Sequence, residues 1–354
     1  MVDTLAACER RRCLNGVRLS IGASGIWPSC PDGVSRARVV GVDVRGGPGG
    51  ARTGRARHVY GPEPNRRVGE IPLSMHGDAS TTPNREPAQP LRGRSGLVTG
   101  GAQGIGRAVA LRLAQLGADV AVNFWHHEAE AKDTAERIRA MGRRALLLEG
   151  DVGSEEDVRR IVASAHRELT SLDFLVNNAG GAGGAETDSP IDSARFEDWS
   201  RLLASNLNSA FLCSRYVSPY MLQQKRGRIV TISSICGITG DCGPAYCASK
   251  AGLLGLTRHS AVALAPFVQV NAILPGFIDS QPHDPKRVAR VTPGRTMGHP
   301  EDVADLAAYL IASPRSFLTG ACIVLDGGVT NGVIGRMMDW NDVTALEASR
   351  LGPL

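Results

Sequence analysis

The chain has 354 residues, of which 42% are hydrophobic and 21% are charged, and its formal net charge is +5. Residues 1–74 hold 12 Arg, no Lys and 6 acidic residues, a balance of +6, which leaves −1 for the remaining 280 residues. A basic nucleic-acid-binding face is therefore not expected on the folded part of the chain. There is also no run of eighteen apolar residues, so the sequence predicts no membrane span.

The first ninety residues differ in composition from the rest of the chain. They are rich in Arg, Gly and Pro and sustain no hydrophobic period, so we predict that residues 1–90 are a disordered extension with at most a short strand at 39–44. An export signal, a transit peptide and a nucleic-acid-binding arm are each disfavoured, because no apolar segment follows the arginines at 10–12 and acidic residues interrupt the stretch. An alternative is a misassigned start, with translation beginning at Met75.

From Leu91 onward, apolar runs of strand length alternate with longer helical segments, which is the pattern of a parallel sheet with helices on both faces. The expected strands are residues 97–99, 120–122, 145–148, 174–176, 229–232, 268–273 and 322–325, and the expected helices are residues 105–116, 128–141, 155–168, 196–224, 246–264 and 301–311. The predicted fold class is therefore α/β, a Rossmann-type doubly wound sheet of about seven strands in one domain, residues 91–328.

Residues 329–354 form a tail beyond the last expected strand. Met337, Trp340, Val343 and Leu346 recur there at helical spacing, so the tail is either an interface helix or a frayed end.

The cysteines lie at positions 8, 13, 30, 213, 236, 242, 247 and 322, with irregular spacing and no Cys-x-x-Cys pair. This distribution favours reduced thiols in the cytoplasm over disulfides or a metal site, so no metal is expected.

A glycine-rich turn follows the first expected strand, where residues 99–106 read TGGAQGIG. Gly100 and Gly104 permit a tight bend and a close approach to a pyrophosphate, and Gly106 permits close packing of the next helix on the sheet. This TGxxxGxG spacing, in its strand–turn–helix context, resembles the short-chain dehydrogenase/reductase family, and the resemblance extends from Leu91 to Gly328.

Further family motifs appear in the expected order: DV at 151–152, NNAG at 177–180, PG at 275–276 and DGG at 326–328. The resemblance implies a nicotinamide dinucleotide cofactor. The residues implied as its contacts are Gly100, Gln103, Gly104, Ile105, Gly106, Asn123, Phe124, His126, Asp151, Val152, Asn178, Ala179, Gly180, Tyr246, Lys250, Pro275, Gly276 and Ile278.

The end of the second expected strand bears on the choice between NADP(H) and NAD(H). Phe124 stands where NAD-dependent relatives place an aspartate, and His126 or His127 could donate to the extra phosphate of NADP. Gln103 argues the other way, because many NADP-using relatives have a cation at that position. We expect NADP(H) rather than NAD(H).

Tyr246 and Lys250 are four residues apart and so lie on one face of the expected helix. The resemblance implies that Tyr246 is the acid/base, that Ser234 rather than Ser233 orients a substrate carbonyl, and that Asn206 holds a water in a proton relay with Lys250. We expect the Lys250 cation and the positive nicotinamide to lower the pKa of the Tyr246 phenol toward neutrality.

The nearest branch that the chain resembles is the 3-oxoacyl-[acyl-carrier-protein] reductases. Residues 225–228 supply one basic site for an acidic carrier protein, but residues 265–267 lack the second, and the segment 277–299 is short and rich in Pro, so we favour a small free ketone or alcohol. The predicted function is therefore an NADPH-linked ketone reductase (EC 1.1.1.-) that forms a homotetramer or dimer. The alternatives are an NAD-linked dehydrogenase of a sugar, polyol or sterol alcohol, and a catalytically idle nucleotide-sensing scaffold.

Overall fold

A computed structural model describes residues 89–169, 171–183, 189–280, 283–314 and 317–331. The predictions for residues 1–88, including the strand at 39–44 and the start at Met75, and those for the tail beyond residue 331 lie outside the described residues.

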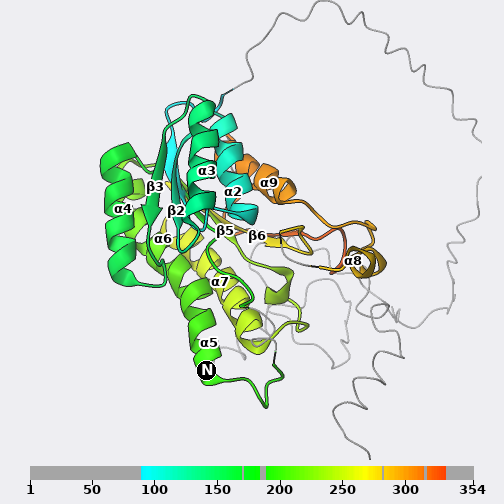
Figure 1. Cartoon of the computed structure of the whole chain (residues 1–354). Helices are drawn as coiled ribbons and strands as arrows, with labels where there is room; N and C mark the ends of the chain where they lie inside the picture. The colour runs from blue at the N-terminus through cyan, green and yellow to red at the C-terminus, as the bar shows by residue number, and fades with distance from the viewer. Residues whose placement is uncertain (1–88, 170, 184–188, 281–282, 315–316, 332–354) are drawn as a thin grey trace, which may run out of the picture. The chain divides into compact units, whose positions relative to one another are not determined.

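A seven-stranded parallel sheet forms the centre of the described chain, with the strand order β3-β2-β1-β4-β5-β6-β7 (Figure 1). The strands are β1 (Ser95–Val98), β2 (Asp119–Phe124), β3 (Ala145–Glu149), β4 (Phe174–Asn177), β5 (Gly227–Ile232), β6 (Val268–Pro275) and β7 (Cys322–Leu325). The order reverses between β1 and β4, so the crevice beyond the carboxyl ends of these two strands is where a doubly wound sheet binds its ligand. The predicted α/β fold class is confirmed.

Helices cover both faces of this sheet (Figure 1). The helices are α2 (Gly104–Gln115), α3 (Glu128–Ala140), α4 (Glu155–Leu169), α5 (Phe196–Leu203), α6 (Ser209–Gln223), α7 (Pro244–Ala263), α8 (Pro285–Val291) and α9 (Pro300–Ala312). Helices α2, α3 and α9 form one layer, and α4, α6 and α7 form the other.

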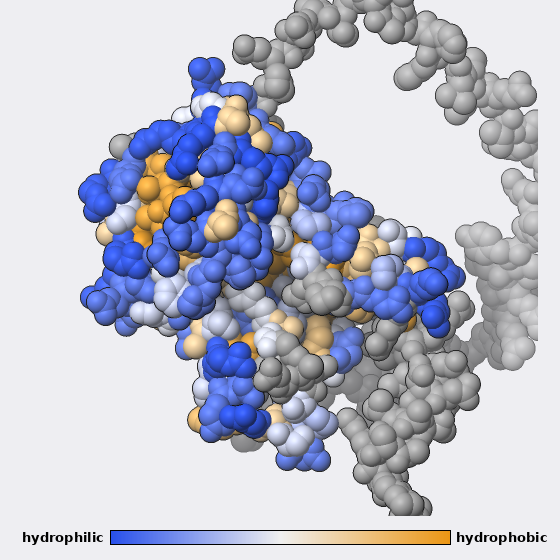
Figure 2. Space-filling model, in the orientation of Figure 1, coloured by the Kyte–Doolittle hydropathy of each residue, from blue (hydrophilic) through white to orange (hydrophobic). Residues whose placement is uncertain are grey.

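Strand residues alternate between two hydrophobic cores because successive side chains point to opposite faces. Val98 and Val176 pack in the core under α2 and α9. Their neighbours Leu97 and Leu175 pack in the core under α4 and α6. Both faces of the central strands are therefore buried, which explains their nearly continuous apolar sequence. The edge strand β3 is less covered, and Figure 2 shows hydrophobic surface between α3 and α4 at this edge.

Helix α4 shows how the sequence determines a helix and the face that it buries. Val158, Ile161 and Ala165 are buried at spacings of three and four, whereas Glu155 and Glu156 stand in the first turn, where the helix dipole favours negative charge.

The segment predicted as one helix over 196–224 is divided in the structure. A π-helical turn, Ala204–Asn208, separates α5 from α6. Such turns bulge one residue out of the regular ladder and often occur at functional sites. The helix α8, inside the Pro-rich segment 277–299, was not predicted.

The amino end of the sheet carries a buried carboxylate, Asp173, whose side chain is 6% exposed. It accepts hydrogen bonds from the Ser95 amide at 3.1 Å, the Ser171 hydroxyl at 2.8 Å, Arg94 at 2.9 Å and Arg226 at 2.5 Å. Burial by itself raises the pKa of Asp173, but these hydrogen bonds outweigh it and hold that pKa below its ordinary value. The cluster joins β1, β4 and the segment before β5.

The expectation of reduced thiols is wrong for one pair: Cys236 and Cys242 form a disulfide. The loop between β5 and α7 turns back sharply and brings the two Cα atoms to 6.0 Å, within the range that a disulfide spans. Cysteines 8, 13 and 30 lie outside the described residues. Among the described helices, none is long and apolar enough to cross a membrane.

Candidate active site

The turn between β1 and α2 gives a backbone cradle at the carboxyl edge of the sheet. Gly100 and Gly104 have φ of +61° and +53°, a region that glycine adopts without strain. A Cβ on Gly106 would lie 2.2 Å from the Gly100 carbonyl oxygen and 2.4 Å from Asn178 Nδ2, so only glycine fits there. Because α2 begins at Gly104, its first amide groups point at this turn, which suits an anionic pyrophosphate.

The carboxyl ends of β1 and β4 are tied together beside this turn. The Thr99 hydroxyl accepts from the amides of Asn178 and Ala179, each at 3.0 Å, and Asn178 Nδ2 donates to the carbonyls of Thr99 and Gly100 at 3.0 and 3.1 Å. These bonds fix the spacing between the glycine turn and the residues after β4.

A cavity of about 490 Å³ opens at this edge, within the usual range for cofactor sites. The predicted cofactor residues that line it are Gly100, Gln103, Gly104, Ile105, Asn123, Phe124, Asp151, Val152, Asn178, Ala179 and Gly180. The predicted residues that do not line it are Gly106, His126, Tyr246, Lys250, Pro275, Gly276 and Ile278. Ile278 is 5% exposed and packs in the core, so its side chain does not reach the cavity. The cradle and the cavity therefore fit a dinucleotide.

The residues at the end of β2 include two histidines, of which only His127 lines the cavity. Phe124 is buried, and Asn123 binds the Gly100 amide and the carbonyls of Leu148 and Gly150, so the last two residues of β2 bring no carboxylate to the cavity. The His126 ring lies against Trp125 at an angle of 51°, and His126 does not line the cavity. His127 does line it, with its Nε2 3.4 Å from Gln103 Nε2.

The loop after β5 and the first turns of α7 bring Ser234 and Tyr246 together. Ser234 approaches the Tyr246 phenol closely enough to lower its pKa, and the Ser234 hydroxyl accepts from the Cys236 amide at 3.2 Å. Ser233, by contrast, donates to the Lys250 carbonyl at 2.8 Å. The side chains of the two adjacent serines thus point in different directions, and the Ser234 side chain is the one that faces the phenol.

Lys250 is buried beneath this pair. Its Nζ lies 5.5 Å from the centre of the Tyr246 ring and donates to the Ile232 carbonyl at 3.1 Å. Burial lowers the pKa of Lys250 to about 8. Burial also raises the pKa of Tyr246 above its ordinary value, although the Ser234 hydrogen bond lowers it. In the chain by itself, burial outweighs the Ser234 hydrogen bond. The expected fall in the pKa of Tyr246 depends also on a positive nicotinamide, so it stays a prediction.

Asn206 lies in the π-helical turn and is 1% exposed. Its Oδ1 accepts from the Gly181 amide at 2.8 Å, and its Nδ2 donates to the Gly181 carbonyl at 3.1 Å and to the Ser249 hydroxyl at 3.2 Å. Asn206 thus joins the loop after β4 to α7, next to Lys250, and its contacts there are with Gly181 and Ser249.

Comparison with known proteins identifies this arrangement. Residues 100–330 match a family model described as enoyl-(acyl carrier protein) reductase. The chain is 34% identical over 244 residues to the 3-oxoacyl-[acyl-carrier-protein] reductase FabG of Staphylococcus aureus, covering 67% of this chain and 98% of that one. The chain belongs to the short-chain dehydrogenase/reductase family.

Other members of the short-chain dehydrogenase/reductase family are equally similar. The enzyme eriH of Hericium erinaceus, named a short-chain dehydrogenase/reductase, is 38% identical over 255 residues, covering 66% of this chain and 97% of that one. A crystal structure of a short-chain type dehydrogenase/reductase from Mycobacterium marinum has a TM-score of 0.63 and 33% identity, covering 68% of this chain and 96% of that one. The chain is therefore an oxidoreductase.

Some residues of this short-chain dehydrogenase/reductase that line the cavity were not predicted. They include His127, named only as an alternative to His126, and Trp125, Gly181, Arg201, Ser205 and Ser280. Ser280 follows the Pro-Gly pair at the end of β6, and Ser205 precedes Asn206, so both stand close to recognised motifs. Arg201 is not adjacent to any recognised motif, so the sequence did not indicate it. Its guanidinium lies 2.7 Å from the Asp198 carboxylate.

Two of the three cations in the basic segment 225–228 are engaged within the chain, and the third, Lys225, is exposed. Arg226 is bound to Asp173, and Arg228 donates to Gln269 and to the Gly227 carbonyl. The segment also precedes β5, at the opposite end of this strand from Ser234. The carrier-protein contact at these residues stays a prediction.

Proposed function

We propose that the domain at residues 91–328 is an NADP(H)-dependent reductase of a small ketone, with Tyr246 as the acid. The observation that carries this proposal is that Ser234 and Tyr246 lie together beside the buried Lys250, at the same edge of the sheet as the glycine cradle.

The roles of the residues follow from their contacts. A reduced nicotinamide, when bound, supplies a hydride to the carbonyl carbon. The Ser234 hydroxyl donates to the carbonyl oxygen, and Tyr246 releases its proton to the same oxygen as negative charge develops there. A phenol with a raised pKa holds this proton at neutral pH, which suits the reductive direction. Lys250, with its pKa near 8, is mainly cationic at pH 7 and stabilises the phenolate that remains.

Asn206 is a positioning residue in this proposal. It holds the Gly181 backbone and Ser249, and Ser249 in turn donates to the Tyr246 carbonyl at 2.9 Å. We assign to it the retention of a water that returns protons toward Lys250.

NADP(H) is preferred because of the end of β2. A carboxylate there would repel the extra phosphate, and this chain has the buried Phe124 instead. Gln103 and His127 present donors at the rim of the cavity. We infer that these two side chains hold the phosphate on the adenosine ribose.

The substrate is best explained as a free ketone, because residues 265–267 supply no second basic site for a carrier protein and Arg226 and Arg228 are engaged within the chain. The relatives named 3-oxoacyl-[acyl-carrier-protein] reductase favour a 3-oxo compound. We place the enzyme in the cytoplasm as a dimer or tetramer, which the likeness to these reductases supports.

The test is a steady-state comparison of the full chain with NADPH and with NADH on a panel of small 3-oxo esters and thioesters, and of the reverse reaction on the corresponding alcohols. We expect kcat/KM for ketone reduction to be at least about tenfold higher with NADPH, a difference of about 1.4 kcal/mol. A preference for NADH together with alcohol oxidation would overturn the proposal.

A further inference from the structure

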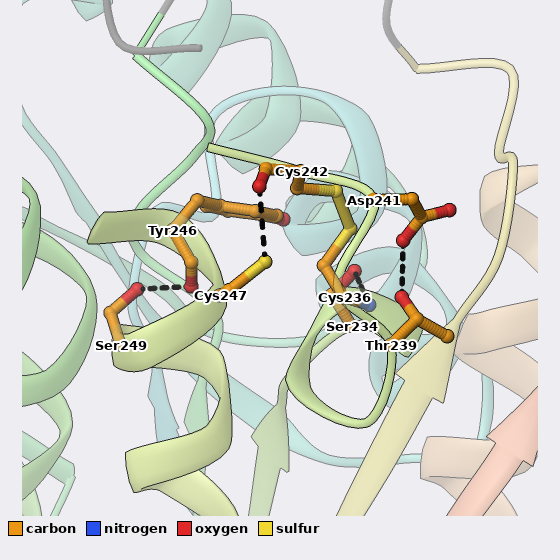
Figure 3. Close-up of a disulfide and its surroundings, with 8 residues drawn as sticks. All are labelled: Ser234, Cys236, Thr239, Asp241, Cys242, Tyr246, Cys247 and Ser249. Atoms are coloured by element: carbon orange, nitrogen blue, oxygen red, sulfur yellow. Dashed lines mark hydrogen bonds between the residues drawn. A yellow bond between two sulfur atoms is a disulfide. The ribbon is translucent and has the colours of Figure 1, made fainter. Parts of the chain in front are cut away.

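The Cys236–Cys242 disulfide lies in the loop that separates the two reacting groups in the sequence. Ser234 stands two residues before Cys236, and Tyr246 stands four residues after Cys242. Figure 3 shows the disulfide beside both side chains, with Cys247 next to it. The disulfide therefore closes the loop that positions Ser234 against Tyr246.

Each half of the disulfide is bonded to the site. The Cys236 amide donates to the Ser234 hydroxyl at 3.2 Å, which directs that hydroxyl, and Ser234 lies near the Tyr246 phenol, whose pKa it lowers. The Cys242 carbonyl accepts from the Cys247 thiol at 3.3 Å, immediately after Tyr246 (Figure 3).

The tip of the loop has little packing of its own. Ile238 is 52% exposed, and nothing lies within 4 Å of the position where a Cβ on Gly240 would be. Thr239 bonds to Asp241, which is a contact inside the loop (Figure 3). Gly237 does pack against the Lys250 backbone, so the base of the loop is anchored on α7 and the tip depends on the disulfide.

One end of the disulfide is accessible to a reductant. Cys236 is 8% exposed, whereas Cys242 is only half-buried and stands beside the exposed Asp241. A thiolate from solvent therefore reaches the Cys242 sulfur first.

We propose that Cys236 and Cys242 are a redox-active pair, whose disulfide state holds Ser234 in place for turnover and whose reduction slows the enzyme. This inference rests on the proposed roles of Ser234 and Tyr246.

The exchange is balanced with a dithiol as the reductant. One of its thiolates attacks the Cys242 sulfur, the bond between the two cysteines breaks, and Cys236 leaves as a thiolate that takes up a proton. The second thiol of the reductant then attacks the mixed disulfide. The products are the Cys242 thiol and the oxidised dithiol, so two electrons pass to the protein pair.

The experiment compares the full chain after treatment with dithiothreitol and after treatment with its oxidised form. Alkylation and mass measurement of the peptide that carries both cysteines establish the state of the pair in each sample. A chelator is present throughout, because the reduced pair and Asp241 have ligand atoms within 4.8 Å of one another and would otherwise bind divalent metal.

We expect reduction to lower kcat by about five- to tenfold, because a small displacement of a group that orients the substrate is costly, and to leave the KM for NADPH nearly unchanged. Cys236→Ser and Cys242→Ser should each resemble the reduced enzyme in both treatments. Cys322→Ser, on β7, is the matched control and should respond to redox treatment as the wild type does.

The pH dependence distinguishes loss of positioning from general damage to the fold. The Ser234 hydrogen bond lowers the pKa of Tyr246, so loosening it should move the Tyr246 ionisation in the pH profile of kcat to a higher pH in the reduced enzyme. Equal kcat in the two states, a full redox response in Cys242→Ser, or an unchanged pH profile would each overturn the proposal, as would two thiols that persist in the oxidised sample.

Failure of the proposed catalytic roles is detected separately. Amide hydrogen exchange of residues 236–242 reports the closure of the loop without any turnover, and it should increase on reduction. Turnover retained by Tyr246→Phe would overturn the roles of the residues, whereas unchanged exchange on reduction would overturn the redox pair.

Discussion

The two ends of the sheet use the same kinds of polar side chain in opposite ways, and β5 joins them. Before β5, Arg226 and its neighbours saturate the buried Asp173 with hydrogen bonds from charged and neutral donors. After β5, Ser234 is buried and Tyr246 half-buried, each with few partners, and Lys250 Nζ is bonded to the Ile232 carbonyl. A saturated cluster stabilises the fold, whereas partly satisfied groups keep a proton that they can transfer.

The largest expected effect comes from removing one oxygen atom, the Tyr246 hydroxyl, at the carboxyl end of the sheet. Tyr246→Phe should lower kcat by about 10³-fold or more, because the acid is lost, while NADPH still binds. Tyr309→Phe, an exposed tyrosine on α9, is the control and should retain full activity. Steady-state kinetics and fluorescence titration with NADPH measure the two effects, and substantial turnover in Tyr246→Phe would contradict the assignment.

At the amino end, removing one charge should affect stability instead of chemistry. Asp173→Asn should lower the free energy of unfolding by about 2–4 kcal/mol, because Arg94 and Arg226 lose their buried partner. Asp305→Asn is the control: it breaks an exposed ion pair with Arg112 and should change the free energy of unfolding by less than about 1 kcal/mol. Urea unfolding at pH 7 measures both.

The same cluster gives a pH dependence with a definite sign. The folded-state pKa of Asp173 lies below its ordinary value of 3.8, so its stabilisation is fully present above that value and is lost as the pH falls through the folded-state pKa. Wild type and Asp173→Asn should therefore converge in stability in this acidic range. If the difference in their free energies of unfolding did not change with pH, the Asp173 carboxylate would not be the source of the stabilisation.

A steric change at the glycine cradle should weaken nucleotide binding. Gly106→Ala places a methyl group 2.2 Å from the Gly100 carbonyl oxygen, so the turn must move, at a cost of about 1–3 kcal/mol, or about ten- to hundredfold in the Kd for NADPH. Gly255→Ala, on α7 with nothing within 4 Å, is the matched control. Equal affinities in the two variants would show that the turn does not contact the nucleotide.

The smallest expected effect concerns the selectivity between the two nucleotides. His127→Ala should weaken NADPH binding by about three- to fivefold and leave NADH unchanged, because it removes one exposed donor to a phosphate. His126→Ala should change neither, since His126 does not line the cavity. Calorimetric titration of both variants with both nucleotides decides which histidine contributes.

Local sequence patterns predicted most of the fold. The strands and helices expected from apolar periodicity appear within a few residues of their predicted bounds, because both faces of each central strand are buried by covering helices. The glycine turn was equally predictable, since Gly106 has no room for a side chain.

Three features depended on contacts between distant segments. The π-helical turn at Asn206 forms where its amide meets Gly181, and periodicity does not distinguish this turn from regular helix. The direction in which the pKa of Tyr246 shifts from its ordinary value depends on burial by neighbours that are remote in sequence. The pairing of Cys236 with Cys242 depends on the path of a loop whose ends are fixed by β5 and α7.

The sequence by itself determined the order of the strands and helices and the cradle, because spacing along one strand or helix fixes which face a residue occupies. It also supplied the candidate reacting side chains, through the family resemblance. Only the tertiary structure decided which histidine reaches the cavity and which cations are already bound to Asp173. These outcomes depend on distances between separate elements, and no local pattern in the sequence specifies such distances.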